Sequence, residues 1–300
     1  MAGIMETKEI KKKKGRKRKH QRLLFIAVVI GLAILIYGVF AVVKAVKIRQ
    51  AQEEMRQKVL EFTSGQKAGE RKVITVNGVR FAFRWCPAGT FMMGPSSEEN
   101  GHVWEMPQHE VTLTKGFWMM ETEVTQKQWK AIMGNNPSYF NSVDTLPVDR
   151  VSWIDCQDFC TKTGMQLPTE AQWEYACRAG STTAYFWGNE DDKYIDYYRP
   201  KPVAYYAPNN WGLYDMNGNS YEYCQDWYGP YPTISVTDPV GPSTGTHHII
   251  RGGGWIWYGT RRTCRSASRN YVLPGSRSIH WASSPTSSLV PTFTVSMCSV

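Results

Sequence analysis

The sequence predicts an α+β protein in which an N-terminal transmembrane helix precedes an irregular, loop-rich domain of short helices and short strands. Residues 23–43 form a 21-residue apolar run without a charge. From Val73 to about Trp281, short apolar runs alternate with Gly, Pro and Asn. The hydrophobic fraction of 42%, with 13% aromatic residues, supplies enough apolar area for a folded core. The class is therefore a membrane helix followed by a folded domain.

The positive charge of the chain is concentrated at its N-terminus. The net charge is +9 over 300 residues, and residues 1–22 carry ten Lys or Arg against Glu6 and Glu9. Residues 23–300 are almost neutral, with 25 basic and 24 acidic residues. Binding of nucleic acid requires cations clustered on the folded surface. The sequence therefore predicts no nucleic-acid partner.

The apolar run 23–43 is long enough to cross the roughly 30 Å hydrocarbon core of a bilayer. A cleaved signal peptide is the alternative, but its apolar region is normally about 7–15 residues and is followed by small residues. Here Lys44, Lys47 and Arg49 follow. More basic residues precede the run than follow it, so the positive-inside rule makes residues 1–22 a cytoplasmic tail. The chain after residue 44 is then periplasmic or extracellular, behind a single-pass cell-membrane anchor.

Two segments follow the predicted membrane helix. Residues 44–63 are polar and free of Gly and Pro, which favours continuation of the helix. SGQKAGER at 64–71 is typical of a flexible joint. We therefore predict a helical stalk and linker over residues 44–72.

Capping signals predict three helices within the domain. They begin at Thr125, Ser152 and Thr169, and they end at Gly134, Gly164 and Gly180. Asp155 and Gln172 occupy the third helical position, where a side chain can bond back to the N-cap backbone. The rest of residues 73–281 is predicted to form short strands and long loops.

An ordered series of motifs gives the domain a family resemblance. The motifs are WCPAGTFMMG (85–94), MPQHEVTLTKGFWMMETEVTQKQW (106–129), NNPS (135–138), LPVDRVSW (146–153), LPTEAQWEYACRAG (167–180), FWGNEDD (186–192), NNWGLYDMNGNSYEYCQDW (209–227), RGGGW (251–255) and CRSASR (264–269). Together they resemble the formylglycine-generating enzyme family, also called sulfatase-modifying factors. The resemblance implies that residues 73–281 form one formylglycine-generating-enzyme-like domain with little regular structure, related to C-type lectins.

The resemblance also implies a calcium site in YDMNGNSYEY. By position, Asp215 and Glu222 would bind the ion through side chains, and Gly218 and Ser220 through carbonyls. This sequence keeps a side-chain oxygen at both carboxylate positions, and hard cations prefer oxygen ligands from a tightly turned loop. The alternative is that both carboxylates are ordinary turn residues. Calcium is therefore the expected cofactor.

Copper is not expected. Oxidases of the family hold copper(I) with two cysteines shortly after the RGGSW block, and soft thiolates suit that ion. Aligned on Trp255, the two positions carry Trp257 and Arg262 here, and Cys264 is the one thiol of the stretch. Cys264 resembles the cysteine of NCRSA in non-oxidase relatives, so a structural or disulfide role is favoured, and a catalytic role follows only if the chain is an enzyme. The seven cysteines allow disulfides in an oxidising compartment but leave their pairing open.

These features predict a binding module that lacks the catalytic cysteine pair, a pseudoenzyme of the family. Lectin-like binders with this fold vary the residues after the RGG-W block, here Ile256, Trp257, Tyr258, Arg261 and Arg262. Aromatic and arginine side chains are enriched at recognition surfaces, so a protein, peptide or glycan ligand is expected there. The alternative is a formylglycine-generating, sulfatase-activating oxidase, or a related oxidative enzyme that uses Cys264.

The C-terminal residues 282–300 form a divergent tail rich in Ser, Thr and Pro. The family ends its core with a GFRL or GFRC strand, whereas GSRSIH is followed here by WASSPTSS. A shift of reading frame near His280 or Trp281 would explain the change. A GFR-like peptide in another frame of the gene is then expected.

Overall fold

The computed structural model describes residues 2–99, 101–190, 199–254, 261–277 and 293–294. The chain divides into two units, Met1–Arg49 and Gln50–Val300, and each is described by itself. Helix α1 (Ala2–Leu60) accounts for the described part of the first unit. The helical segment Arg22–Leu60 is long and apolar enough to cross a membrane, with a mean hydropathy of 2.9 in its most apolar window.

The second unit begins with the last turns of α1, which contribute to its core. Ala51, Met55 and Val59 recur every four residues, so they share one face of the helix, and all three are buried. They belong to the same apolar cluster as Phe81, and the Trp118 indole N–H donates a 2.8 Å hydrogen bond to the Thr63 carbonyl. Residues 50–60, within the predicted stalk, therefore belong to the folded unit.

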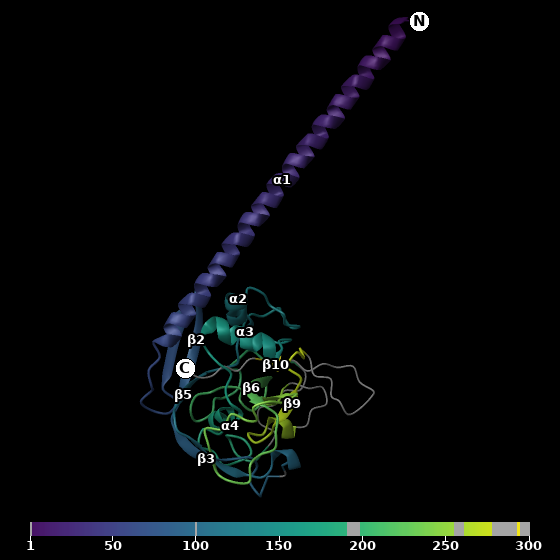
Figure 1. Ribbon diagram of the computed structural model, residues 1–300. Coiled ribbons are helices and arrows are strands. Elements are labelled where there is room, and N and C mark those ends of the chain that lie inside the picture. Colours follow the sequence, from purple (N-terminus) through teal and green to yellow (C-terminus); the bar gives the residue numbers. More distant parts are fainter. Residues whose placement is uncertain (1, 100, 191–198, 255–260, 278–292, 295–300) are drawn as a thin grey trace. The chain divides into compact units, whose positions relative to one another are not determined.

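Among the described residues of this unit, the strands form three small sheets, and several of these strands are labelled in Figure 1. The antiparallel sheet β1-β2-β5 consists of β1 (Arg71–Val76), β2 (Val79–Cys86) and β5 (Phe117–Met120). The sheet β3-β4-β7 consists of β3 (Gly89–Met93), β4 (His109–Leu113) and β7 (Val236–Thr237). The sheet β10-β6-β8-β9 consists of β10 (Phe293–Thr294), β6 (Tyr221–Trp227), β8 (His248–Arg251) and β9 (Asn270–Val272).

The described residues of the unit also form three further helices and two 3₁₀ turns. They are α2 (Gln126–Met133), α3 (Trp153–Thr163), α4 (Glu170–Arg178), η1 (Val103–Glu105) and η2 (Arg261–Cys264). The predicted N-caps Thr125, Ser152 and Thr169 all form capping boxes. The α4 helix ends one residue earlier than predicted, because Ala179 itself adopts the left-handed conformation with φ of 45°.

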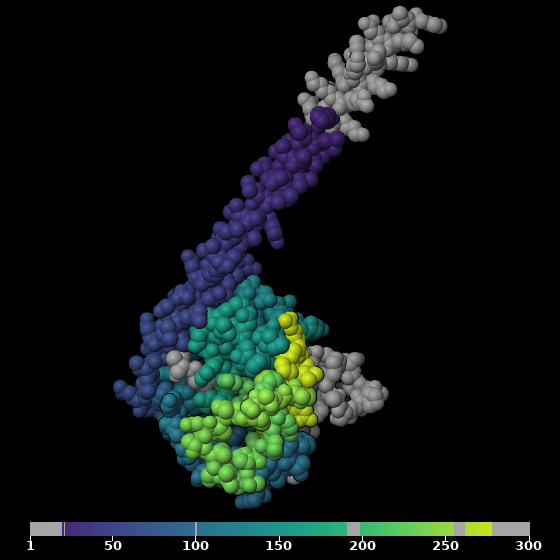
Figure 2. All heavy atoms as spheres, viewed as in Figure 1, coloured from purple at the N-terminus to yellow at the C-terminus, as the bar shows by residue number. Residues whose placement is uncertain are grey.

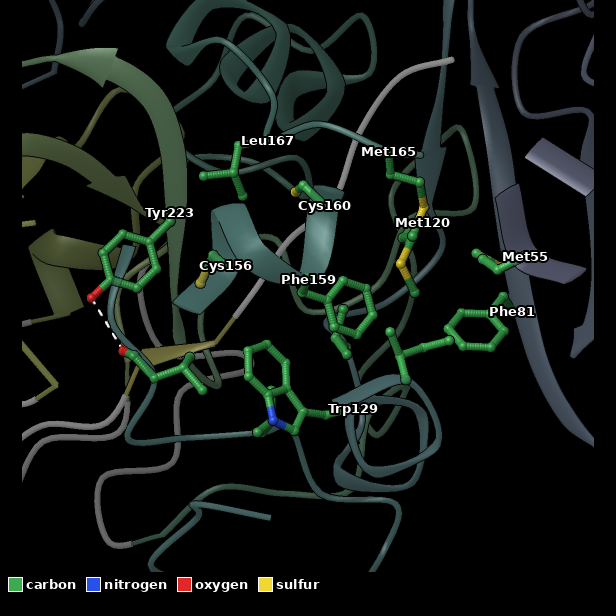
Figure 3. Packing of buried hydrophobic residues seen from close by; sticks show 14 of the residues in the cluster. Met55, Phe81, Met120, Trp129, Cys156, Phe159, Cys160, Met165, Leu167 and Tyr223 are labelled. Carbon is green, nitrogen blue, oxygen red and sulfur yellow. Dashed lines mark hydrogen bonds between the residues drawn. The ribbon is translucent and has the colours of Figure 1, made fainter. Parts of the chain in front are cut away.

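Two large apolar clusters hold these elements together. In the first, Trp129 of α2 stacks on Phe159 of α3 with ring centroids 5.2 Å apart, beside Phe81 and Met55 (Figure 3). In the second, Trp173 of α4 packs among apolar residues of the β3-β4-β7 sheet. The mixture of helices and small sheets agrees with the predicted class.

The segment 261–277 lies against α3, as the yellow and teal atoms of Figure 2 show. The Ile154 amide donates to the Pro274 carbonyl at 3.4 Å, and Arg277 forms a 2.8 Å ion pair with Asp155. Within the tail 282–300, Phe293 and Thr294 pair in parallel with Tyr221 and Glu222 of β6. The predicted frame-shift point at His280 or Trp281 lies outside the described residues.

Candidate functional site

Two segments far apart in sequence bring the candidate metal residues together. The residues after β5 lie beside the loop that precedes β6, where the Tyr214 amide donates a 2.9 Å hydrogen bond to the Glu121 carbonyl. The loop turns tightly because Asp215, Gly218 and Asn219 all have positive φ. Asp215 on this loop and Glu222 on β6 lie within electrostatic reach of Glu123, two residues beyond Glu121.

Asp215 and Glu123 are both buried, with exposed fractions of 4% and 1%. Oδ2 of Asp215 accepts a 2.6 Å hydrogen bond from the Ala204 amide, and Oε1 of Glu123 accepts a 3.0 Å bond from Nδ2 of Asn219. Among the described residues, no separate donor satisfies the other oxygens, Asp215 Oδ1 and Glu123 Oε2, which are buried. The two carboxyl groups interact with one another instead.

The other predicted calcium ligands lie on the same loop and on β6. Oε2 of Glu222 accepts a 2.7 Å hydrogen bond from the Trp173 indole, and the Gly218 carbonyl accepts a 2.8 Å bond from the Ser220 amide. Within the described part of the chain, no three His, Cys, Asp or Glu side chains already converge as a metal-binding group. The structure thus places Asp215 and Glu222 near one another and adds Glu123, which the sequence reasoning missed.

Electrostatic properties of the cluster suit a hard cation. Burial raises the pKa of Glu123, and the neighbouring charges of Asp215 and Glu222 raise it further. Burial also raises the pKa of Asp215 to about 6. All the candidate ligands are oxygen atoms, the type that Ca²⁺ prefers, and two of them are buried without a separate donor among the described residues. The donor atoms are therefore of the type that calcium prefers, but no three described His, Cys, Asp or Glu side chains are arranged around a common point.

The predicted recognition stretch is described only at its ends. Ile256, Trp257 and Tyr258 lie outside the described residues. Arg261 begins η2, and the side chain of Arg262 is exposed. The structure therefore places one of the predicted ligand-binding side chains in solvent.

Cys264 is buried, with an exposed fraction of 1%, and burial raises the pKa of its thiol to about 12. A Cβ atom placed on Gly253 would lie 2.5 Å from its sulfur, so the thiol packs directly against the backbone of the RGGGW block. The six described cysteines are all buried, and Cys156, Cys160, Cys177, Cys224 and Cys264 form no disulfide within the described part of the chain. Cys298, the seventh, lies outside the described residues.

Fixed structure borders the recognition stretch on both sides. Gly254 is buried, and the Cys264 carbonyl accepts a 2.8 Å hydrogen bond from Asn217. Arg265 forms buried ion pairs with Glu105 at 2.7 Å and with Glu99 at 3.1 Å. The described residues on both sides of positions 255–260 are therefore held in place.

The matches to known proteins agree with this fold and these blocks. The family model described as "Sulfatase-modifying factor enzyme 1-like domain" matches residues 82–281. The chain belongs to this family, which is the formylglycine-generating enzyme family expected from the motifs. The match includes the candidate calcium loop and the RGGGW block, so both lie within the family domain.

Two curated relatives named formylglycine-generating enzyme match part of this chain. The formylglycine-generating enzyme of Mus musculus is 30% identical over 186 residues, which cover 54% of this chain and 49% of the relative. That of Thermomonospora curvata is 35% identical over 178 residues, which cover 51% of this chain and 58% of the relative. The chain thus spans about half the length of these relatives.

One solved structure matches this chain over nearly all of its own length. Treponema denticola variable protein 1 has a TM-score of 0.65 and 25% sequence identity, and the match covers 76% of this chain and 98% of that one. The second unit therefore shares its fold with that protein.

Proposed function

We propose that this chain is a membrane-anchored, outward-facing member of the family that binds a protein, peptide or glycan ligand and lacks copper-oxidase chemistry. The observation that carries the proposal is the burial of Cys264. It is the one thiol between residues 251 and 269, and its sulfur packs against Gly253 instead of facing solvent.

Copper(I) in an oxidase of this type needs two soft ligands that a substrate thiolate can join. The aligned positions carry Trp257 and Arg262, and neither side chain is a soft donor. A thiol with a pKa of about 12 is almost entirely protonated at neutral pH. Cys264 is therefore best explained as a core residue of the binding module.

The proposed recognition surface centres on Trp257, Tyr258, Arg261 and Arg262. The described residues on both sides of it are held in place, which lowers the entropy cost of binding a ligand there. The loop that Arg265 holds through Glu105 also exposes two large side chains, Val103 at 80% and Trp104 at 45%. The exposed Trp104 and Arg262 are of the aromatic and cationic types that recognition surfaces use most.

The second candidate function is the formylglycine-generating oxidase itself. It is favoured by the relatives of that name at 30% and 35% identity. The test is mass spectrometry of a sulfatase-type cysteine peptide after incubation with the full-length, copper-loaded protein and oxygen. We expect unchanged peptide. An aldehyde product that is lost in Cys264→Ser would reject the binding module in favour of the oxidase.

Binding is tested on an array of peptides and glycans. Wild-type protein is compared with Trp257→Ala and with Tyr258→Ala, and Lys127→Ala on the exposed face of α2 serves as the control. Truncation of an aromatic anchor costs on the order of 2 kcal/mol, or about thirtyfold in affinity. Spots bound by wild type and by Lys127→Ala should be lost in both aromatic variants; equal retention would exclude this stretch as the recognition surface.

The anchor and its orientation belong to the same proposal. The apolar segment of α1 and the basic residues before it support a single-pass helix with a cytoplasmic N-terminus. Protease added to spheroplasts should digest the chain beyond about residue 60 and leave an N-terminal tag intact. A protected C-terminal domain would reverse the orientation, and release of the domain from membranes would indicate a cleaved signal sequence.

We also propose calcium as the structural ion of the domain. Asp215 and Glu222 would bind it through side chains, and Gly218 and Ser220 through carbonyls. Oδ1 of Asp215, which no separate donor among the described residues satisfies, supports this assignment. An ion that binds only the folded state raises the melting temperature by mass action, so chelation should lower it. An unchanged melting curve with and without chelator would exclude the ion.

A further inference from the structure

Two pairs of aromatic rings lie at the surface, outside the candidate calcium loop and outside the recognition stretch. His102 stacks on Trp104, with ring centroids 4.4 Å apart and ring planes 8° from parallel. Tyr228 packs against Tyr271 with ring centroids 4.3 Å apart. Trp104 and Tyr271 nevertheless remain 45% and 44% exposed. Each pair therefore covers part of a ring and leaves the rest of that ring to solvent.

Arg269 connects the two pairs. Its Nη1 donates hydrogen bonds to the Trp104 carbonyl at 3.2 Å and to the Gly229 carbonyl at 2.9 Å. Its guanidinium carbon also lies 5.1 Å from the centre of the Tyr228 ring. Arg269 is itself buried and forms a 2.6 Å ion pair with Glu170. The η1 turn and the residues after β6 are therefore neighbours, and a buried group fixes their backbones.

The segments that carry these rings contain almost no charge. Residues 101–109, 227–236 and 270–276 include one Asp, Glu, Lys or Arg, which is Glu105. Its carboxylate is buried and paired with Arg265. An anionic ligand such as a nucleic acid requires cations, which these segments do not supply. The surface therefore suits a neutral ligand.

A sugar ring matches this combination of groups. The negative face of an aromatic ring attracts the C–H groups on the face of a pyranose. Sugar hydroxyls need partners that can donate and accept hydrogen bonds, and the hydroxyls of Tyr228 and Tyr271 and the imidazole of His102 are of this type. Rings that are already held in place lose little entropy when a ligand stacks on them. The geometry and the chemistry of the surface therefore favour the same class of ligand.

We propose that the aromatic surface formed by His102, Trp104, Tyr228 and Tyr271 binds a neutral oligosaccharide by stacking of its pyranose rings. The surface contains no residue of the recognition stretch. It would therefore operate whether or not that stretch binds a ligand of its own.

The test is isothermal titration calorimetry of the full chain with two uncharged probes, cellohexaose and the β-1,4-linked hexamer of N-acetylglucosamine. The detergent has no sugar headgroup, because such a headgroup would compete for the surface. Trp104→Ala and Tyr271→Ala should each weaken binding of the sugar about tenfold or more, because each removes an aromatic anchor. Both side chains are exposed, and circular dichroism checks that both variants are folded. Wild-type protein that binds neither probe would overturn the proposal.

Tyr139→Ala is the matched control. Tyr139 is 59% exposed and lies 5.0 Å from the ring of Phe140, so it belongs to another exposed aromatic pair. It lies between α2 and α3, whereas the aromatic surface is formed by η1, the end of β6 and β9. This variant should bind the sugar as the wild type does. Equal losses in Tyr139→Ala and Trp104→Ala would indicate unspecific adsorption to aromatic side chains and overturn the site.

Two further measurements test the nature of the contact. Tyr271→Phe keeps the ring and removes only the hydroxyl, so most of the affinity should remain; a loss as large as in Tyr271→Ala would overturn stacking as the basis of binding. Cellohexaose oxidised to a carboxylate at C6 keeps the rings and adds charge, so it should bind more weakly. Equal binding of the two forms would overturn the preference for a neutral ligand.

The outcomes also separate this surface from the recognition stretch and from other ligands. Sugar binding that is lost in Trp257→Ala but retained in Trp104→Ala and Tyr271→Ala would place the oligosaccharide on the recognition stretch, which supports the proposed function and overturns this inference. Binding of a peptide or of lipid vesicles that is lost in Trp104→Ala, without any sugar binding, would assign the surface to another class of partner and overturn it equally.

Discussion

Arg265 and Glu105 form a buried ion pair in which Nη2 and Oε2 are 2.7 Å apart. The same guanidinium reaches Glu99 through Nη1 at 3.1 Å. The pair joins the η1 turn to the segment that follows η2, and these segments are 160 residues apart in sequence. It therefore fixes one border of the proposed recognition stretch to the rest of the domain.

Substitution of Arg265 should lower the unfolding free energy substantially. Arg265→Met leaves two carboxylates buried without a cation, and removal of one partner from a buried pair typically costs about 3–5 kcal/mol of unfolding free energy. Arg277→Met is the control, because its ion pair with Asp155 is 61% exposed on the arginine side and is worth about 0–1 kcal/mol. Urea denaturation of the full chain in detergent measures both. Equal losses would contradict the buried network.

Buried residues at the end of α1 should contribute to the stability of the folded domain. Met55 is fully buried among the apolar residues of the first cluster, so Met55→Ala should lower the unfolding free energy by about 2–5 kcal/mol. Gln57, two residues further on, is exposed. Gln57→Ala should therefore change the unfolding free energy by no more than about 0.5 kcal/mol. The same urea titration distinguishes them. A negligible effect of Met55→Ala would return residues 50–60 to the role of a stalk.

The helices of the domain could be predicted because their signals are local. Thr125, Ser152 and Thr169 each accept a hydrogen bond from the third residue of their helix, within one turn. The role of Met55 could not be predicted in this way. Its neighbours in the core come from distant strands, and a polar, helix-favouring sequence is equally compatible with a solvated stalk.

The residues of the candidate site could likewise be predicted only where they are close together in the sequence. Asp215 and Glu222 lie in one short motif, so a family resemblance could identify them together. Glu123 is 96 residues from Asn219, which binds its carboxylate, and nothing local marks it as part of that loop. Its burial and its interaction with Asp215 are properties of the folded chain alone.

The pH dependence of stability should contain a contribution from Asp226. Burial, and then the charge of Glu170, raises the pKa of Asp226 from 3.8 to about 7. The folded state therefore binds a proton more tightly than the unfolded state. The resulting stability is fully present below about pH 3.8 and is lost as the pH rises through about 7.

Asp226→Asn tests this contribution. The amide oxygen can still accept the hydrogen bond from the Glu170 amide, but the group no longer titrates. Unfolding free energies measured between pH 4 and pH 8 should fall less steeply in the variant than in the wild type. Parallel profiles would show that Asp226 does not titrate in this range.

The last prediction concerns the thiol that decides between the two functions. Burial excludes solvent from Cys264 and raises its pKa to about 12, and only a thiolate reacts quickly with an alkylating agent. Iodoacetamide at pH 8 should therefore leave Cys264 unmodified in the native protein and modify it fully in urea. Peptide mass spectrometry of both samples provides the measurement, and the other five described cysteines, all buried, should follow the same pattern. Rapid alkylation of Cys264 in the native state would instead reveal an accessible, activated thiol, and the oxidative enzyme would then become the better reading of this domain.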